Sequence, residues 1–278
     1  MKISFHGVRG FIPVPGARTL CYGGNTLSFG VETENGSLVG IDAGTGLSTW
    51  SRALMARADM RGSGKFNLII THTGYEHVQG FSFFIPALVG GNTVNIYQHN
   101  DINIADVLES QVAAEFSPMQ TLSNFGSDIK FFSYKSDEII QIDELSIVLQ
   151  TFPCGNSKST AVKIQDKNST AVFLTQVTHN TESIKKIIDF SSGADILIHD
   201  SFSGGDITNS SRDFSNDGQQ AVEVASAAGV SKLILTRYHH SLDDKNLEDI
   251  LKRCIDSPSN KNPELCIELS REGNIILI

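Results

Sequence analysis

The sequence predicts a layered α/β fold, in which β-sheets are covered by helices on their outer faces. Short apolar, β-branched runs recur along the whole chain and are bounded by Gly, Asn, Asp or Ser, as strands commonly are. Helical patterns alternate with these runs. The 278 residues, of which 40% are hydrophobic, are enough to bury a large core. We therefore expect one globular domain spanning residues 1–278.

The expected strands are short runs with high β-propensity, separated by residues that favour turns. One pair forms a hairpin, because Asp166, Lys167 and Asn168 separate two apolar runs and favour a tight turn. In chain order, the expected strands occupy residues 2–5, 27–31, 37–41, 67–70, 93–97, 129–132, 145–151, 161–164, 171–174, 196–198, 232–235, 265–269 and 275–278.

Three segments carry apolar residues at helical spacing: 178–190, 218–228 and 244–255. The first has Thr178 or Asn180 as its N-cap. The second ends at Gly229, a residue suited to the left-handed position that follows a helix. Between the first two segments lies a polar stretch, residues 201–217, without any period. It predicts a long loop, either functional or a disordered insertion.

Composition and charge exclude several classes of protein. The 31 acidic residues outnumber the 22 basic ones, and the net charge of -9 disfavours nucleic-acid binding, which needs a basic surface. The chain has no run of 18 apolar residues and begins without a signal-peptide pattern, so a membrane role is not expected and we expect a cytoplasmic protein. The cysteines form no C-x-x-C pair, which argues against a zinc knuckle or a redox pair; they are Cys21, Cys154, Cys254 and Cys266.

Five motifs follow one another along the chain. They are GVRGFIPVPGARTLCYGGNTLSFGVE (7–32), IDAGTG (41–46), NLIITHTGYEHVQG (67–80), GADILIHDSF (193–202) and AVEVASAAGVSKLILTRYHH (221–240). In this order they resemble the metallo-β-lactamase superfamily, in its RNase Z-like and cyclic-phosphodiesterase-like branch. The resemblance covers nearly the whole chain. It implies an αββα sandwich of two mixed sheets with helices outside and a metal site at one edge between the sheets.

In the resembling family, five histidines and two aspartates hold two metal ions, which activate a water for hydrolysis. The resemblance places His72 and His77 at two of these histidines. Gly74 stands where the family has a histidine, and Glu76 where it has an aspartate. Glycine has no side chain to coordinate a metal, and glutamate is one methylene longer than aspartate.

The remaining family positions are altered as well. Phe152 or Gly155 takes the place of the next histidine, Gln176 that of the bridging aspartate and Arg237 that of the last histidine. Residues 214–217 replace a further His-Ser-Thr motif of the branch. Five of the seven implied ligands are thus changed. Because a neutral amide and a guanidinium have entered the site, we hypothesise that Arg237 occupies the space of one metal ion and pairs with Glu76 or Asp200.

We interpret the chain as a degenerate member of this fold that has lost metal-dependent hydrolysis and acts by binding, in a regulatory, sensory or assembly role. No cofactor is expected and no catalytic residue is assigned. The expected partner is a protein or a small anionic ligand, with Arg9 and Arg237 as candidate anion contacts, and the resemblance also suggests a homodimer. The old cleft comprises His72, Glu76, His77, Gln176, Asp200 and Arg237.

The alternative is a divergent hydrolase that acts on a phosphodiester through a reduced or relocated metal site. One zinc, manganese or iron ion would then be held by His72, Glu76 and His77, with His239 or His240. Other roles stay open at the level of sequence. Asp200 is either an active-site acid or a strand-end carboxylate, and Arg9 is either an anion contact or a buried anchor. The resemblance gives Asp42 a structural role beside the metal motif.

Overall fold

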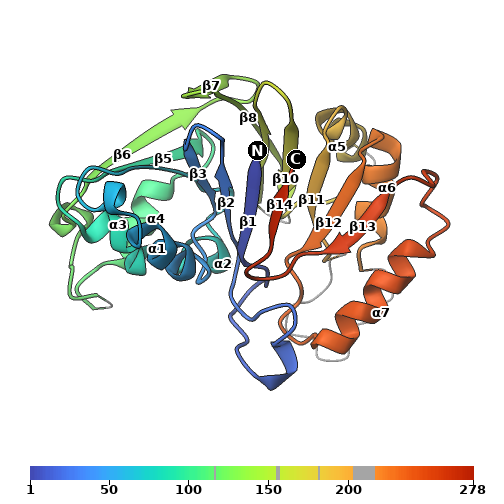
Figure 1. The fold of residues 1–278 in the computed structure, drawn as a ribbon, viewed down its shortest axis with the longest axis horizontal. Helices are drawn as coiled ribbons and strands as arrows, with labels where there is room; N and C mark the ends of the chain where they lie inside the picture. The colour runs from blue at the N-terminus through green and yellow to red at the C-terminus, as the bar shows by residue number, and fades with distance from the viewer. Residues whose placement is uncertain (116, 155–156, 181, 203–216) are drawn as a thin grey trace.

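The structure is a computed structural model that describes residues 1–115, 117–154, 157–180, 182–202 and 217–278 (Figure 1). In this part of the chain the strands form two seven-stranded sheets. In Figure 1 the strands occupy the middle of the molecule and helices lie on both sides of them. The layered α/β class and the αββα arrangement predicted above are confirmed.

The first sheet is built from the N-terminal half of the chain and one C-terminal strand. Its order is β14-β1-β2-β3-β4-β5-β6, antiparallel from β14 to β3 and parallel from β3 to β6. The strands are β1 (Lys2–Gly7), β2 (Ser28–Glu32), β3 (Leu38–Ile41), β4 (Lys65–Ile69), β5 (Thr93–His99), β6 (Asp128–Tyr134) and β14 (Ile275–Leu277).

The second sheet has the order β13-β12-β11-β10-β9-β8-β7. It is parallel from β13 to β10 and antiparallel from β10 to β7, so both sheets are mixed, as predicted. The strands are β7 (Ile139–Ile142), β8 (Leu145–Cys154), β9 (Ser157–Gln165), β10 (Thr170–Leu174), β11 (Ile196–Asp200), β12 (Lys232–Thr236) and β13 (Cys266–Leu269).

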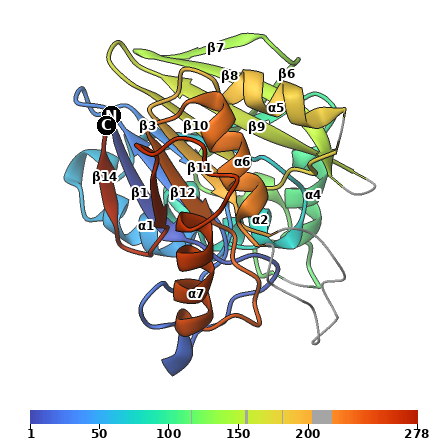
Figure 2. The same ribbon diagram turned by 90° about the vertical axis from the view of Figure 1, so that its right-hand side faces the viewer.

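Helices cover the outer faces of the two sheets. Within the described residues, α1 to α4 lie on the side of the first sheet and α5 to α7 on the side of the second (Figure 1), and Figure 2 shows α5, α6 and α7 in front of the second sheet. The α-helices are α1 (Leu47–Met55), α2 (Tyr75–Val78), α3 (Ile85–Leu88), α4 (Ile104–Gln111), α5 (Ser183–Ser191), α6 (Gln219–Ala228) and α7 (Asp244–Ile255); the 3-10 turns are η1 (Ala17–Thr19), η2 (Ala58–Met60), η3 (Phe81–Phe83) and η4 (Leu122–Asn124). No helix in the described ranges is both long and apolar enough to cross a bilayer.

Two hydrophobic cores hold the layers together. The larger lies between the sheets, where the rings of Phe29 on β2 and Phe173 on β10 approach to 5.7 Å between centroids. The smaller lies between the first sheet and its helices, and includes Trp50 of α1 and Leu108 of α4. Burial of apolar surface on both faces of the first sheet is the main term that stabilises this half of the molecule.

The structure differs from the sequence prediction at several elements. The helix expected at 178–190 begins at Ser183, because the Asn180 side chain accepts from the backbone N–H groups of Glu182 and Ser183 and forms a turn before the helix. Strand β7 and helices α1 and α4 were not predicted. The hairpin at 166–168 is confirmed between β9 and β10, as is the end of α6 at Gly229, where φ is 69°. Most of the loop expected at 201–217 lies outside the described residues.

The topology brings the ends of several strands from both sheets together. Asp42 follows β3, His72 follows β4, Gln176 follows β10 and Arg237 follows β12, while Asp200 is the last residue of β11. Carboxyl ends of strands are the usual place for sites in α/β folds. This edge therefore positions the candidate site.

Candidate functional site

A buried ion cluster lies where the sequence analysis placed the old metal cleft. The Arg237 guanidinium donates from Nη2 to Glu76 Oε1 at 2.6 Å and from Nη1 to Asp200 Oδ2 at 3.0 Å. All three side chains are buried, and Arg237 is only 3% exposed. Arg237 thus contacts both carboxylates that the sequence analysis named as its partners, and it joins residues from α2, β11 and the end of β12.

Aromatic rings cover the same guanidinium. The Arg237 Cζ atom lies 4.8 Å from the centroid of the Phe11 ring and 5.7 Å from that of Phe202. A cation over an aromatic face is favourable, more so when both are desolvated. The backbone of Phe11 and of Arg237 is left-handed, with φ of 69° and 55°, a conformation that non-glycine residues seldom adopt. The contact between Arg237 and the Phe11 ring therefore coincides with backbone strain at both residues.

The two carboxylates of the cluster differ in their acidity. Burial raises the pKa of Asp200 to about 7, although the nearby Arg237 charge lowers it. Burial also acts to raise the pKa of Glu76, but the charges of His77 and Arg237 outweigh it and bring this pKa to about 2. Near neutral pH, Glu76 is therefore the permanent anion that pairs with Arg237, and Asp200 changes its protonation state.

His77 is held from both sides of its ring. Its Nδ1 lies 2.9 Å from Asp42 Oδ2, and its Nε2 donates to Gln176 Oε1 at 2.8 Å. Burial lowers the pKa of His77, but the Asp42 and Glu76 carboxylates raise it more, so the net shift is upwards. Both ring nitrogens of His77 thus have partners within the protein. Gln176, at the position of the bridging aspartate, accepts the hydrogen bond from Nε2.

His72 has a different protonation state. The Gly74 N–H donates to its Nδ1 at 2.8 Å, so the neutral ring carries its proton on Nε2 and donates it to Ser157 Oγ at 2.9 Å. Burial is the main reason that the pKa of His72 falls to about 4. Ser157 Oγ donates in turn to the Cys154 carbonyl. His72 therefore cannot act as a base towards Ser157.

Glycine at position 74 fits this arrangement. A Cβ atom there would lie 2.7 Å from His72 Nδ1, closer than real Cβ contacts come. Cys154 also lies beside the cluster, and burial raises the pKa of its thiol. Its sulfur therefore stays protonated near neutral pH and is a weak nucleophile.

Asp42 has the structural role that the resemblance implied. Its Oδ1 accepts from the Thr71 backbone N–H at 2.9 Å and from Thr71 Oγ1 at 2.8 Å. Its own backbone is left-handed, with φ of 61°. These contacts fix the segment that leaves β4 and carries His72 and His77.

The residues present do not fit the dinuclear metal centre of the resembling family. Arg237 and Gln176 take two ligand positions, and Phe152, 2% exposed, belongs to the hydrophobic core. Within the described ranges, no group of three or more His, Cys, Asp or Glu side chains is arranged to hold a metal ion. Position 155 and residues 214–216, which the sequence analysis also compared with ligand positions, lie outside those ranges.

The remaining candidate residues pack around the ion cluster or serve the fold. His239 and His240 stack at 4.1 Å between ring centroids, and both lie against the Phe11 ring that covers Arg237. His239 Nδ1 lies 2.8 Å from Ser241 Oγ. Arg9 is fully buried and donates from Nε and Nη1 to the carbonyls of Gly23 and Leu242. These contacts favour the buried-anchor interpretation of Arg9 over the anion contact. Arg237 is likewise buried, and its Nη1 and Nη2 donate to Asp200 and Glu76.

One histidine pair, formed by the buried His199 and the half-buried His179, was missed by sequence reasoning. His199 Nε2 lies 3.1 Å from His179 Nε2, and the two rings stack with centroids 5.0 Å apart. Burial lowers the pKa of His199 to about 3, so this ring is neutral. The sequence signal that could have located His199 is the alternation of strand β11, in which neighbouring side chains point to opposite faces. A buried Asp200 facing the cleft therefore implied that His199 faces the helices.

Comparison with solved structures places this geometry among known folds. The chain is similar to the metallo-β-lactamase fold protein YhfI from Bacillus subtilis, with 17% identity, a TM-score of 0.67, and 99% of this chain and 98% of that chain covered. It is also similar to a diphosphatase from the PhnP family, with 15% identity, a TM-score of 0.63 and coverage of 100% and 97%. The short form of human tRNase Z matches with 14% identity, a TM-score of 0.62 and coverage of 100% and 99%.

Sequence comparisons alone find nothing: no family model matches the chain, and neither does any curated protein. The structural similarity extends over the whole chain at identities that establish the fold and not the activity. Together with the two mixed seven-stranded sheets and their outer helices, it identifies the architecture. The chain has the metallo-β-lactamase fold.

Proposed function

We propose that this protein acts by binding, in a regulatory, sensory or assembly role, and that it does not carry out metal-dependent hydrolysis. One observation carries the proposal. Arg237 donates to both Glu76 and Asp200, at the edge between the sheets where the resembling family binds its metals. A metal ion there would have to displace a guanidinium already bonded to the two carboxylates.

The energetics of the cluster support this proposal. Removing one partner from a buried ion pair leaves a charge without compensation, which costs about 3–5 kcal/mol. A dication entering beside Arg237 would also meet the positive charge of the guanidinium in a medium of low dielectric constant. The cluster therefore opposes the displacement of Arg237 and the entry of a metal.

The first test measures metal. Protein purified without chelator is analysed for its elemental content, and its melting temperature is compared with and without EDTA. We expect far less than one zinc, manganese or iron per chain, no effect of EDTA, and no hydrolysis of bis(p-nitrophenyl) phosphate. Stoichiometric metal that disappears in His72→Ala and His77→Ala, together with phosphodiesterase activity, would establish the hydrolase instead.

The second test measures binding. Thermal-shift screening with cyclic nucleotides, phosphorylated metabolites and uncharged aromatic compounds surveys small ligands, while light scattering after size-exclusion chromatography reports whether the chain forms a homodimer. We expect at least one class of ligand, or self-association, to raise the melting temperature. A monomer that responds to no compound and captures no partner from its own organism would contradict a binding role.

A further inference from the structure

One turn of the first sheet contains a pair of neighbours that can react with each other. Asn35 and Gly36 lie in the turn between β2 and β3, and the dipeptide Asn-Gly occurs once in the 278 residues. Asn35 is exposed to solvent. The side-chain amide of an asparagine is open to attack by the backbone nitrogen of the next residue. The surroundings of this pair therefore decide whether the amide survives.

The turn leaves room around the pair. Gly36 has a φ of 88°, which glycine adopts without strain, and a Cβ atom there would meet nothing within 4 Å among the described residues. Asn35 and Gly36 also line a hollow of about 580 Å³, together with Asp143 and Glu144. The Asn35 side chain thus has space to approach the Gly36 nitrogen, and water reaches both residues.

One hydrogen bond opposes the reaction. The Gly36 N–H donates to the Thr33 carbonyl at 3.1 Å and closes the turn. The nitrogen is therefore free to react only while this bond is open. Turns at the surface open locally at a small cost in free energy, so the folded protein slows the reaction without preventing it.

The chemistry needs water and no other reactant. The Gly36 nitrogen loses its proton and attacks Cγ of Asn35, so a new C–N bond closes a five-membered succinimide. The C–N bond of the side-chain amide breaks, and its nitrogen leaves as ammonia with the proton that Gly36 lost. Water then opens the ring. Addition at Cγ gives aspartate, and addition at the backbone carbonyl gives isoaspartate, in which the main chain runs through Cγ.

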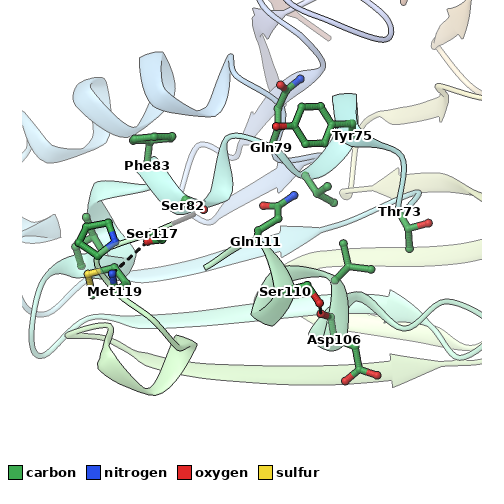
Figure 3. A pocket seen from close by; sticks show the side chains of 14 residues that line it. Thr73, Tyr75, Gln79, Ser82, Phe83, Asp106, Ser110, Gln111, Ser117 and Met119 are labelled. Atoms are coloured by element: carbon green, nitrogen blue, oxygen red, sulfur yellow. Dashed lines mark hydrogen bonds between the residues drawn. The ribbon is translucent and has the colours of Figure 1, made fainter. Parts of the chain in front are cut away.

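Other side-chain amides lack this combination of features. In the turn between β9 and β10, Asn168 precedes Ser169, whose side chain crowds the nitrogen and whose N–H donates to Asp166 Oδ1 at 2.8 Å. Gln79 and Gln111 line a cavity of about 850 Å³ between α4 and the segment of α2 and η3 (Figure 3). A glutamine must close a six-membered ring, which forms more slowly. Within the described residues, Asn35 is the amide best placed to react.

Carboxylates surround Asn35. Asp143 and Glu144 form the turn between β7 and β8 of the second sheet. Ser37 Oγ lies 2.8 Å from Glu144 Oε2 and 3.1 Å from Asp143 Oδ2, and Thr33 Oγ1 donates to Glu144 Oε1. Asn35 also donates to Glu144, and the hydrogen bonds from Thr33, Ser37 and Asn35 lower the pKa of this carboxyl. The β2–β3 turn thus contacts the second sheet through donors that face two carboxylates.

From these observations we infer that Asn35 is a site of spontaneous covalent modification, at which the side-chain amide is lost as ammonia and a carboxylate takes its place. The Asn35 donor becomes an additional carboxylate beside Asp143 and Glu144, and like charges repel one another. The isoaspartate form also lengthens the main chain of the turn by one carbon. The contact between the two sheets at this turn therefore weakens as the protein ages. This inference does not depend on the proposed function.

Mass spectrometry of the unaltered protein tests the inference. We expect the peptide that contains residues 33–37 to gain one dalton during incubation, faster at pH 8 than at pH 6 because the attacking nitrogen must lose a proton. An isoaspartate methyltransferase should label the product. The peptide with Asn168 is the internal control and should stay unmodified. An intact Asn35 after a period in which the urea-denatured protein is converted completely would overturn the inference.

Two variants locate the reaction at this pair. Gly36→Ala places a side chain beside the attacking nitrogen and should slow the reaction at least tenfold. Because alanine is strained at a φ of 88°, the second variant is Asn35→Gln, which leaves Gly36 in place and should abolish the reaction over the same period. A mass gain in the same peptide of Asn35→Gln would show that another residue reacts, and would contradict the assignment.

A further variant measures the effect of the new charge. At low ionic strength, Asn35→Asp should raise the equilibrium constant of unfolding about two- to fivefold, the size of one interaction between surface charges. Asn35→Ala is the matched control, because it removes the donor without adding a charge, and it should have a smaller effect. Added salt should bring the two variants together. Equal stability of the two variants at low salt would contradict the predicted repulsion.

Discussion

Arg237 is surrounded by carboxylates and aromatic rings that all interact favourably with its positive charge. Its two carboxylate partners, Glu76 and Asp200, are themselves buried, and the cost of desolvating them is compensated only while the guanidinium remains. The aromatic rings of Phe11 and Phe202 complete its surroundings. The cluster therefore has little tolerance for the loss of a single member.

Replacing this arginine gives the first prediction at the residue scale. At pH 8, Arg237→Gln should lower the free energy of unfolding by about 3–5 kcal/mol, because two buried carboxylates lose their partner. The control is Arg18→Gln, which removes an exposed ion pair with Asp243 and should cost less than about 1 kcal/mol. Urea denaturation measures both. Equal, small losses in the two variants would mean that Arg237 does not compensate the carboxylates.

The pH dependence of stability gives a second prediction. The pKa of His6 is lowered to about 4, mainly by burial and then by Lys2, whereas the ring protonates near pH 6.5 in the unfolded chain. Between these values the unfolded state binds the extra proton, so this group contributes stability that is lost as the pH falls from 6.5 to 4. His72 and His199 act in the same direction, and Asp200, with its raised pKa, acts in the opposite one.

The measurement is the free energy of unfolding between pH 4 and pH 7. His6→Asn should reduce the slope of this free energy against pH by up to about 1.4 kcal/mol per pH unit, which is the slope that one additional bound proton produces. His6 is a suitable choice because it contacts Ser4 and Trp50 and lies outside the ion cluster. An unchanged slope would mean that His6 titrates normally in the folded protein.

Sequence reasoning named most of the residues that the structure brings together in the ion cluster and around His77. Gly74, Gln176 and Arg237 were recognisable because the motifs fix their register. The hydrogen-bond partners of His77 and His72 were not, since Gln176 and Ser157 come from the other sheet and are brought close only by the fold. His199 was missed because only its neighbour was considered.

At the scale of single elements, helix α6 shows how local chemistry sets a boundary. It ends at Gly229, whose φ of 69° is left-handed, and a Cβ there would meet nothing within 4 Å. Gly229→Ala should therefore cost about 1–2 kcal/mol through backbone strain alone. Gly229→Asn should cost less, because asparagine tolerates this conformation. Thermal or urea unfolding measures the difference.

The control for this glycine is Gly16. Its φ of 166° is extended backbone, and it also has open space around its Cβ position. Gly16→Ala should leave stability nearly unchanged. A loss as large as that of Gly229→Ala would show that the effect is not due to the left-handed conformation.

Helices and strands were predictable where their apolar residues keep a regular spacing or where a capping residue marks their end. Helix α7 has the predicted bounds and begins with a capping box between Asp243 and Asn246. Strand β7 is only four residues long and alternates between exposed and buried positions, so too few residues carry its period. Helix α1 buries Leu47, Trp50, Ser51 and Leu54, a helical spacing in which a serine stands among the apolar positions.

At the scale of the whole molecule, the two sheets share one core. Residues of both sheets belong to the same buried cluster, in which Phe29 and Phe173 meet. The motif order made the architecture predictable, because each motif marks a strand end of the same fold. The sandwiching of the sheets, by contrast, depends on contacts far apart in the sequence, which periodicity alone does not reveal.

This shared core predicts that residues 1–278 unfold as one unit. Trp50, the single tryptophan, reports on the first sheet and its helices, whereas far-UV circular dichroism reports on all elements. The two signals should give coincident urea transitions with one midpoint. A fluorescence transition separated from the circular dichroism transition would instead indicate two independently folding halves.

The ion cluster also has a consequence for how the protein matures. The bonds of Arg237 to Glu76 and Asp200 come from the chain itself, so the cleft is complete as soon as folding ends. A zinc- or iron-loaded relative must still acquire its ions after synthesis and competes for them when the cell is starved. The proposed function implies that this chain needs no such loading step, so we expect its abundance to stay constant under metal starvation.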